Sequence, residues 1–205
     1  MTPKHVHAVV LAAGMSTRMG SLKQLLPFGG RTVLQTVVDT LLGGGLDGIM
    51  VVLGHRSEAV KRHLAGRGVA TCVNADYREG MFSSVLCGIS SLPESTDAAL
   101  IVLGDQPRID ARVVRRVVEA YRSGSRGIVI PTFGGKRGHP ALVDLRKYRH
   151  DIFALCGDAG LKPVMRGHPD DTLELPVDDA AILWDIDTPE DYREELARQR
   201  VRRKG

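Results

Sequence analysis

Short apolar runs alternate along the chain with longer segments in which apolar residues recur every three or four positions. The runs are nearly continuous, as is typical of strands buried on both faces of a parallel sheet. They cover residues 7–13, 48–53, 69–73, 98–103 and 127–131. The longer segments have the spacing of amphipathic helices and cover residues 32–42, 57–64, 80–92 and 111–122. This alternation predicts an α/β fold with a mainly parallel, doubly wound sheet, whose ligands bind beyond the carboxyl ends of the strands.

The alternation breaks down after residue 131. Residues 131–143 predict a glycine-rich loop and a short strand. The next expected elements are a partly helical segment and two short strands, at residues 155–166, 172–175 and 182–185. A terminal helix is predicted at 189–198, with Pro189 in its first turn. We expect residues 131–185 to form a small lobe over the sheet with space for a second ligand.

The length of 205 residues suits one domain with a full hydrophobic core. The formal net charge is +4, but residues 198–205 contain five cations and no acid, so the rest of the chain is nearly neutral. A basic end to the terminal helix explains this charge, since cations are favourable at the negative pole of a helix dipole. Aromatic residues make up 4% of the chain, too few for the stacking surfaces of single-strand binders. We therefore expect no nucleic-acid partner.

Three cysteines at widely spaced positions form no CxxC pair and match no Cys/His zinc-binding spacing. They suggest free thiols in a reducing compartment. The N-terminal residues lack the apolar core of a signal peptide, and no apolar run approaches the ~18 residues of a membrane span. The sequence therefore predicts a cytoplasmic protein with no membrane partner.

The loop after the first predicted strand, GMSTRMGSLK, combines small residues with cations. Gly14 and Gly20 leave room for backbone N–H groups to approach an anion, and Arg18 and Lys23 add positive charge. The loop lacks both the GK[ST] ending of a P-loop and the GxGxxG pattern of nicotinamide-binding folds. Its composition favours a phosphate-binding loop. The alternative is a glycine-rich surface loop whose cations serve no ligand.

Carboxylates lie where a metal–phosphate site would need them. Asp105 directly follows the most apolar predicted strand, and Asp110 is better placed than Asp105 to cap the next helix. Asp185 and Asp187 are separated by one residue, so they share a face of an extended segment. Thr188 is expected to cap the terminal helix, with Asp187 as the alternative cap. Asp105 and Asp187 are thus candidates to hold one Mg²⁺, with Mn²⁺ as the alternative ion.

The chain contains, in this order, the segments LAAGMSTRMGSLKQLLPFGG, VNADYREGMFSSVLCGI, VLGDQPRID, RGHPALV, GDAGLK and DIDTPEDY. Together they resemble the molybdenum cofactor cytidylyltransferases of the MobA-like nucleotidyltransferase family. The resemblance extends from about residue 7 to residue 192 and implies a Rossmann-like nucleotidyltransferase fold in a single domain, residues 1–205. It further implies a nucleotide-binding part at about 5–125, a second-substrate excursion at about 131–185 and a basic C-terminal tail at 198–205.

The resemblance implies transfer of CMP from CTP to the terminal phosphate of molybdopterin, with release of pyrophosphate. A recipient molybdoenzyme or its chaperone is then the partner that takes the product. The alternatives are a sugar- or polyol-phosphate nucleotidyltransferase, a guanylyl-transferring homologue and a nucleotide-binding protein without catalysis. Ala13 favours a pyrimidine base, because guanylyl-transferring relatives usually have glycine there. A methyl group discriminates by only ~1–3 kcal/mol, so the other bases stay open.

The resemblance also assigns roles to residues. Arg18 and Lys23 hold the triphosphate and form the catalytic set with Asp105, while Asp105 and Asp187 hold the metal. The nucleotide-binding residues are Leu11, Ala12, Ala13, Gly14, Lys23, Gly80, Ser83 and Ser84. The residues that face the second substrate are Gly138, His139, Pro140, Gly157 and Lys162. No protein nucleophile is required, because an anionic phosphate held in line with the α-phosphorus of CTP attacks it directly.

Overall fold

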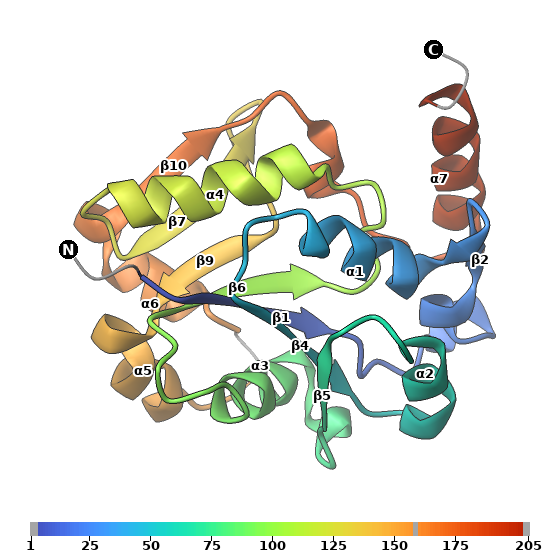
Figure 1. The fold of residues 1–205 in the computed structure, drawn as a ribbon, viewed down its shortest axis with the longest axis horizontal. Helices are drawn as coiled ribbons and strands as arrows, with labels where there is room; N and C mark the ends of the chain where they lie inside the picture. Colours follow the sequence, from blue (N-terminus) through green and yellow to red (C-terminus); the bar gives the residue numbers. More distant parts are fainter. Residues whose placement is uncertain (1–3, 158–159, 203–205) are drawn as a thin grey trace.

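The computed structural model describes residues 4–157 and 160–202. It has a central β-sheet with helices on both faces (Figure 1). The strands of the sheet are β1 (Val6–Leu11), β4 (Gly48–Leu53), β5 (Ala70–Val73), β6 (Ala98–Leu103), β7 (Ile128–Phe133), β8 (Lys136–Arg137), β9 (Ala141–Asp144) and β10 (Thr172–Pro176). The helices are α1 (Val33–Leu42), α2 (Ser57–His63), α3 (Met81–Ser90), α4 (Ala111–Ser123), α5 (Leu145–Ala154), α6 (Lys162–Gly167) and α7 (Pro189–Arg202). A short hairpin, β2 (Pro27–Phe28) and β3 (Arg31–Thr32), precedes α1.

The order of strands across the sheet is β10-β7-β9-β6-β1-β4-β5, with β8 paired to the end of β7. β1 lies between β4 and β6 and pairs with both in parallel. The pairs β4–β5 and β7–β10 are also parallel, whereas β9 runs antiparallel between β6 and β7. The predicted α/β fold with a mainly parallel sheet is confirmed, and β9 makes the sheet mixed.

Residues 131–185 are more closely joined to the sheet than the sequence predicts. The expectation is a lobe over the sheet, but β9 enters the sheet between β6 and β7, and β10 forms one of its edges. All of β9 is buried, and so short an apolar run after a glycine-rich loop gives little signal of a central strand. The helices of this segment, α5 and α6, cover one face of the sheet.

Two local expectations for this segment need correction. The sequence does not predict α5, which ends just before residue 155. The segment predicted to be partly helical at 155–166 contains α6, which begins at Lys162. Most residues of α5 are polar, and its buried face is formed by Leu145, Tyr148 and Ile152. The strand predicted at 182–185 is wrong, since the 3-10 helix η5 (Ala180–Leu183) lies there. The Asp179 side chain accepts a hydrogen bond from the backbone N–H of Ala181 (3.0 Å), which favours a turn over an extended strand.

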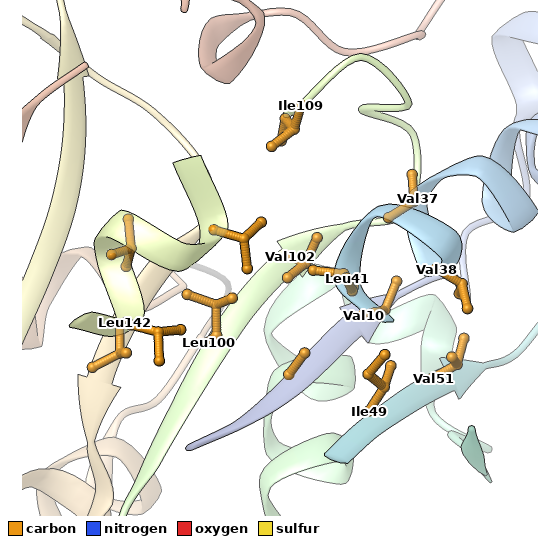
Figure 2. Packing of buried hydrophobic residues seen from close by; sticks show 14 of the residues in the cluster. Val10, Val37, Val38, Leu41, Ile49, Val51, Leu100, Val102, Ile109 and Leu142 are labelled. Atoms are coloured by element: carbon orange, nitrogen blue, oxygen red, sulfur yellow. The ribbon is translucent and has the colours of Figure 1, made fainter. Parts of the chain in front are cut away.

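An apolar layer lies on each face of the sheet. Figure 2 shows the layer beneath α1, where Val37 and Leu41 of the helix lie near Val10 of β1. The helices α2 and α4 pack on the same face, whereas α3, α5 and α6 pack on the other. Val9 and Val10 belong to opposite layers, which explains why the strand runs are apolar throughout. Among the described residues, no helix is both long and apolar enough to cross a membrane.

The C-terminal segment runs along the carboxyl end of β6. The backbone N–H of Ile186 donates to the carbonyl oxygen of Asp105 (3.2 Å), which brings residues 185–187 beside that end. Thr188 then caps α7, because its Oγ1 accepts from the N–H of Asp191 (3.2 Å) and its own N–H donates to the Asp191 carboxylate (2.8 Å). The prediction that Thr188 caps this helix is confirmed. Figure 1 shows α7 at the end of the molecule toward which β1 and β6 point.

Candidate active site

The loop that follows β1 is folded around a buried glutamine. Gln24 is only 3% exposed, and its Nε2 donates to the carbonyl oxygens of Ala12 (3.3 Å) and Gly14 (3.2 Å). Its Oε1 accepts from the hydroxyl of Ser16 (3.3 Å), and the same hydroxyl oxygen accepts from the backbone N–H of Lys23 (3.2 Å). These bonds tie the start of the loop to its end. The side chain of Lys23 is therefore held at a defined place beside the carboxyl end of β1.

Lys23 joins carboxylates from two distant segments. Its Nζ donates to Asp105 Oδ2 and to Asp187 Oδ1, the latter at 3.0 Å. Arg18 donates to the other oxygen of Asp187 at 2.8 Å. The Lys23 and Asp105 side chains are 16% and 14% exposed, whereas Arg18 is 68% exposed. The structure thus brings the cationic loop and both predicted metal ligands together at one edge of the sheet.

Burial and charge act in opposite directions on these groups. Burial raises the pKa of Asp105, and the attraction of the Lys23 ammonium only partly offsets it. Burial disfavours the charge of Lys23, but the attraction of Asp105 and its bonds to both carboxylates outweigh this and raise the pKa of Lys23. Burial also acts to raise the pKa of Asp187, but the hydrogen bond from Lys23 and the charge of Arg18 hold it below its usual range. Lys23 is therefore positively charged in this cluster.

A third carboxylate completes a group that fits a divalent metal. One oxygen each from Asp105, Asp185 and Asp187 lie within 4.8 Å of one another. Oδ1 of Asp105 is buried and has no hydrogen-bond partner among the described residues. Carboxylate oxygens are hard ligands of the kind that Mg²⁺ and Mn²⁺ prefer, and a buried oxygen without a partner needs a cation or a donor. The sequence predicts Asp105 and Asp187 as ligands, and the fold adds Asp185.

The first cavity lies beside this cluster and has a volume of about 240 Å³. It is lined by residues from the ends of β1 and β6, the loop after β1, and the start of α3: Leu11, Ala13, Gly14, Lys23, Gln24, Tyr77, Gly80, Met81, Ser84, Leu103, Gly104 and Asp105. Most of the residues predicted to bind the nucleotide are in this lining. Gly80 has φ +106°, a conformation that favours glycine, and it turns the chain into α3 directly at the cavity.

Two of the predicted nucleotide-binding residues lie outside that lining. Ala12 is 2% exposed, and its N–H donates to the carbonyl oxygen of Val52 (3.0 Å). The hydroxyl of Ser83 lies 2.9 Å from the carbonyl oxygens of both Gly80 and Asp76, so it serves the turn before α3. These contacts show how both residues support the shape of the first cavity.

The second cavity, of about 340 Å³, adjoins the first and shares Leu11 and Met81 with it. Its cations come from β8 and α6, and its other walls are largely apolar. The lining residues are Leu11, Met81, Val85, Ile101, Ile130, Arg137, Gly138, His139, Ala141, Gly160, Leu161, Lys162, Met165 and Arg166. Of the residues predicted to face a second substrate, Gly138, His139 and Lys162 are therefore in the lining. Pro140 lines a separate, small cavity, and Gly157 is exposed and outside both linings.

The Gly138–His139 turn is packed tightly against the segment before the carboxylates. A Cβ on Gly138 would lie 2.4 Å from the carbonyl oxygen of Ile182, so only glycine fits there. The N–H of His139 donates to the same oxygen at 3.0 Å. Burial of the imidazole lowers the pKa of His139, and a hydrogen bond to the backbone of Ile101 only partly opposes this. His139 therefore presents a neutral ring to the second cavity.

Several site residues have no clear signal in the sequence. Gln24 and Tyr77 lie in 3-10 helices of only three residues, and Asn74 follows a strand. Arg137 and Arg166 are two among many cations, and only the fold places them at one cavity. Gln24 lies between Lys23 and Leu25, so no apolar run marks it as a buried hydrogen-bonding residue.

A family model described as the MobA-like NTP transferase domain matches residues 8–172. The nicotine blue oxidoreductase of Paenarthrobacter nicotinovorans is 31% identical over 193 residues, which cover 90% of this chain and 93% of that protein. The molybdenum cofactor cytidylyltransferase of Escherichia coli (strain K12) is 27% identical over 188 residues, which cover 91% of this chain and 93% of that protein.

Solved structures with the same fold include Rv0371c from Mycobacterium tuberculosis H37Rv. Its crystal structure is 30% identical, with a TM-score of 0.85, and the match covers 96% of this chain and 100% of that one. The complex of the same protein with manganese is matched with a TM-score of 0.80 and 27% identity, over 95% of this chain and 99% of that one. A relative with this fold thus takes a divalent metal.

Proposed function

Since the chain belongs to the MobA-like NTP transferase family, we propose that it transfers CMP from CTP to the terminal phosphate of a molybdopterin-type acceptor and releases pyrophosphate. Membership of this family supports nucleotidyl transfer in general. The choice of CTP and of a molybdopterin-type acceptor depends on which nucleotide binds in the first cavity and which acceptor binds in the second.

The observation that carries the proposal is that two adjoining cavities meet, the first of which has Asp105 of the carboxylate cluster in its lining. The first cavity has Lys23 and Asp105 in one part of its lining and Ser84 at the start of α3, so it offers charged partners for phosphates and a separate polar contact for a nucleoside. The second adjoins it and supplies Arg137, Lys162 and Arg166, which suit a phosphate group. Two phosphorylated substrates bound in these cavities would meet at their shared boundary.

Transfer of CMP requires that the two substrates are positioned and that the developing charge is stabilised, and it requires no reactive side chain. An oxygen of the acceptor phosphate forms a bond to the α-phosphorus of CTP, and the bond from that phosphorus to the β-phosphate oxygen breaks. Lys23 and Arg18 stabilise the negative charge that develops on the pyrophosphate. A divalent metal held by Asp105, Asp185 and Asp187 would supply further positive charge to the triphosphate. The acceptor phosphate is already anionic, so no general base is needed.

The walls of the second cavity support an acceptor that joins a phosphate to a ring system. Ile101, Ile130 and Met165 give it apolar surfaces, whereas its cations lie on β8 and α6. A pterin has flat faces for the apolar walls and polar edges for a neutral group such as His139. A sugar or polyol phosphate lacks the flat apolar faces, which makes it the less suitable acceptor.

A second candidate function is reduction of a planar aromatic compound. The observation that favours it is the 31% identity, over 90% of this chain, to a relative named nicotine blue oxidoreductase. Hydride transfer from a nicotinamide would not require the carboxylate cluster, two of whose members are paired with Lys23. Oxidation of NADH or NADPH by this protein in the presence of a planar aromatic dye, without consumption of CTP, would support the reductase over the transferase.

The decisive experiment measures pyrophosphate release with CTP, GTP and ATP, each with and without molybdopterin and Mg²⁺. The expected result is release that requires CTP, the pterin and the metal together. An Asp105→Asn variant, which keeps the size of the side chain, should lose this release while keeping its circular dichroism spectrum. Equal release from GTP would assign the chain to the guanylyl-transferring type, and release with a sugar phosphate in place of the pterin would overturn the acceptor assignment.

A further inference from the structure

Asn74 lies directly behind the lining of the first cavity, just after β5, and is 4% exposed. Its Oδ1 accepts a hydrogen bond from the backbone N–H of Asp76 (2.9 Å). A backbone N–H is always a donor, so this bond fixes which end of the amide is the oxygen. The Nδ2 group must then face α3, where it donates to the hydroxyl oxygens of Ser83 (2.8 Å) and Ser84 (3.0 Å).

The two serines use their own hydrogens differently. The Ser83 hydroxyl lies 2.9 Å from the carbonyl oxygens of Gly80 and Asp76, so its hydrogen is bonded within the turn before α3. The Ser84 hydroxyl accepts from Asn74, and within the described part of the chain no acceptor takes its hydrogen. Ser84 lines the first cavity, and Ser83 does not. Ser84 therefore presents a hydrogen-bond donor to the ligand, and Asn74 prevents the hydroxyl from turning its hydrogen inward.

The position of Ser84 in the cavity determines what this donor meets. Lys23 and Asp105 mark the part of the lining that suits phosphates, whereas Tyr77, Met81 and Ser84 line the part around the start of α3. A nucleotide whose phosphates lie at Lys23 places its base at this second part. The base needs an acceptor where the Ser84 hydroxyl points.

We propose that Asn74 is a positioning residue that fixes Ser84 as a donor to the central ring nitrogen of the base, and that this pair selects cytosine over uracil. N3 of cytosine is an acceptor, whereas N3 of uracil carries a hydrogen that would face the Ser84 hydrogen. The selection acts through the direction of one hydroxyl, which a buried amide controls. The inference rests on the proposed function for its choice of a pyrimidine nucleotide, but it is tested by binding alone.

The experiment measures dissociation constants by isothermal titration calorimetry with Mg²⁺ and three probes: CTP, UTP and the triphosphate of pyrimidin-2-one riboside. The third probe keeps the N3 acceptor and lacks any group at C4, so it separates the ring nitrogen from the amino group. The wild-type protein should bind CTP and the pyrimidinone nucleotide about tenfold or more tightly than UTP. With CTP the Ser84 hydroxyl forms a hydrogen bond to N3, whereas with UTP it faces the hydrogen on N3, and a difference of this kind corresponds to about tenfold in affinity.

Substitutions at Asn74 should change this ratio in a defined direction. In Asn74→Asp the carboxylate accepts from the Ser84 hydroxyl, whose lone pairs then face the base, so the ratio should shift about tenfold or more toward UTP. Asn74→Ala and Ser84→Ala should each bring the ratio close to one, and the double variant should bring no further change, because Asn74 acts through Ser84. Ser90→Ala, which changes an exposed serine at the other end of α3, is the matched control and should keep the wild-type ratio. Thermal melting verifies that each variant is folded. If Asn74→Asp does not fold, Asn74→Ala and Ser84→Ala still test the proposal.

The outcomes separate this inference from the proposed function. A wild-type protein that binds CTP in preference to UTP, with a ratio that no substitution at Asn74 changes, overturns the role of Asn74 and leaves the transferase standing. A wild-type preference for UTP overturns the polarity assigned to Ser84. If the wild-type protein binds neither nucleotide, both the inference and the proposed use of CTP are wrong.

Discussion

Lys23 is the residue on which the site depends most directly. Its ammonium lies between Asp105 and Asp187, and the loop bonds around Gln24 hold it there. In the absence of other ligands it offsets part of the negative charge of the carboxylate cluster. A triphosphate bound in the first cavity would offer it a second set of anionic partners, so the same side chain can serve both the cluster and the substrate.

Replacing Lys23 should therefore affect catalysis strongly. We expect Lys23→Ala to lower kcat/KM by roughly 10²–10³, or about 2.7–4 kcal/mol of transition-state stabilisation, because charge on the departing pyrophosphate loses its main partner. The measurement is the steady-state rate of pyrophosphate release. Lys61→Ala, which removes an exposed lysine of α2, is the control and should behave like wild type. A rate for Lys23→Ala within about threefold of wild type would remove this residue from the site.

Residue-level alternatives that the sequence leaves open are decided by hydrogen bonds. Asp110 caps α4 by accepting from the N–H of Arg112 (2.8 Å), which confirms the preference for Asp110 over Asp105 as the cap. The N-terminus of α7 is capped by Thr188 with Asp191. Since neither cap uses Asp105 or Asp187, both carboxylates are left for Lys23 and for a metal.

At the scale of elements, α3 is the helix that links the core to the first cavity. Its first residues line that cavity, and its later residues Val85 and Ile89 are buried against the sheet. Gly88 allows the helix to lie close to β1 and β4, since a Cβ there would lie 2.3 Å from Val9 Cγ1 and 2.8 Å from Val52 Cγ2. The packing of α3 thereby sets the depth of the cavity that its N-terminus lines.

Adding one methyl group at this contact should be costly. We expect Gly88→Ala to destabilise the protein by about 1–3 kcal/mol, because β-branched core side chains cannot move aside without strain. The melting temperature should fall by roughly 2–4 °C per kcal/mol for a chain of this size. Gly167→Ala is the matched control, since no atom lies within 4 Å of the added Cβ, and it should be neutral or stabilising. Equal melting temperatures for the two variants would contradict the close packing of α3.

At the scale of the whole molecule, the site exists because segments from both ends of the chain meet. Lys23 and Arg18 join the loop after β1 to Asp187 in the segment before α7. The hydrogen bond from Ile186 to Asp105 joins that segment to the end of β6. The phenol of Tyr192 adds a further link by donating to the carbonyl oxygen of Pro27. Figure 1 shows α7 and the β2 hairpin close together at this end of the fold.

A ligand bound at this junction should protect both segments at once. On addition of CTP and Mg²⁺, hydrogen exchange should slow in residues 11–24 and in residues 185–188, because a single ligand would stabilise them together. Exchange in α5, which lies outside the first cavity, should remain unchanged. Mass spectrometry of peptides from both regions provides the measurement. Protection confined to residues 11–24 would mean that the carboxylate segment takes no part in binding.

The sequence by itself determined the fold class and the outline of the site. Strands buried on both faces and amphipathic helices leave periodic patterns that are local, so the α/β alternation could be predicted from short windows. The loop after β1 and Asp105 were identified in the same way, because each follows directly from an apolar strand. These features depend on residues that are neighbours in the chain.

Only the tertiary structure decided which distant groups share a site. The place of β9 in the sheet and the proximity of Asp105 to Asp185 and Asp187 both depend on contacts between distant segments. No local pattern encodes them, because a buried hydrogen bond needs only one suitable partner, which can come from any part of the chain. The polarity of a hydroxyl or the charge of a cluster is therefore set by packing, after the sequence has fixed the elements that pack.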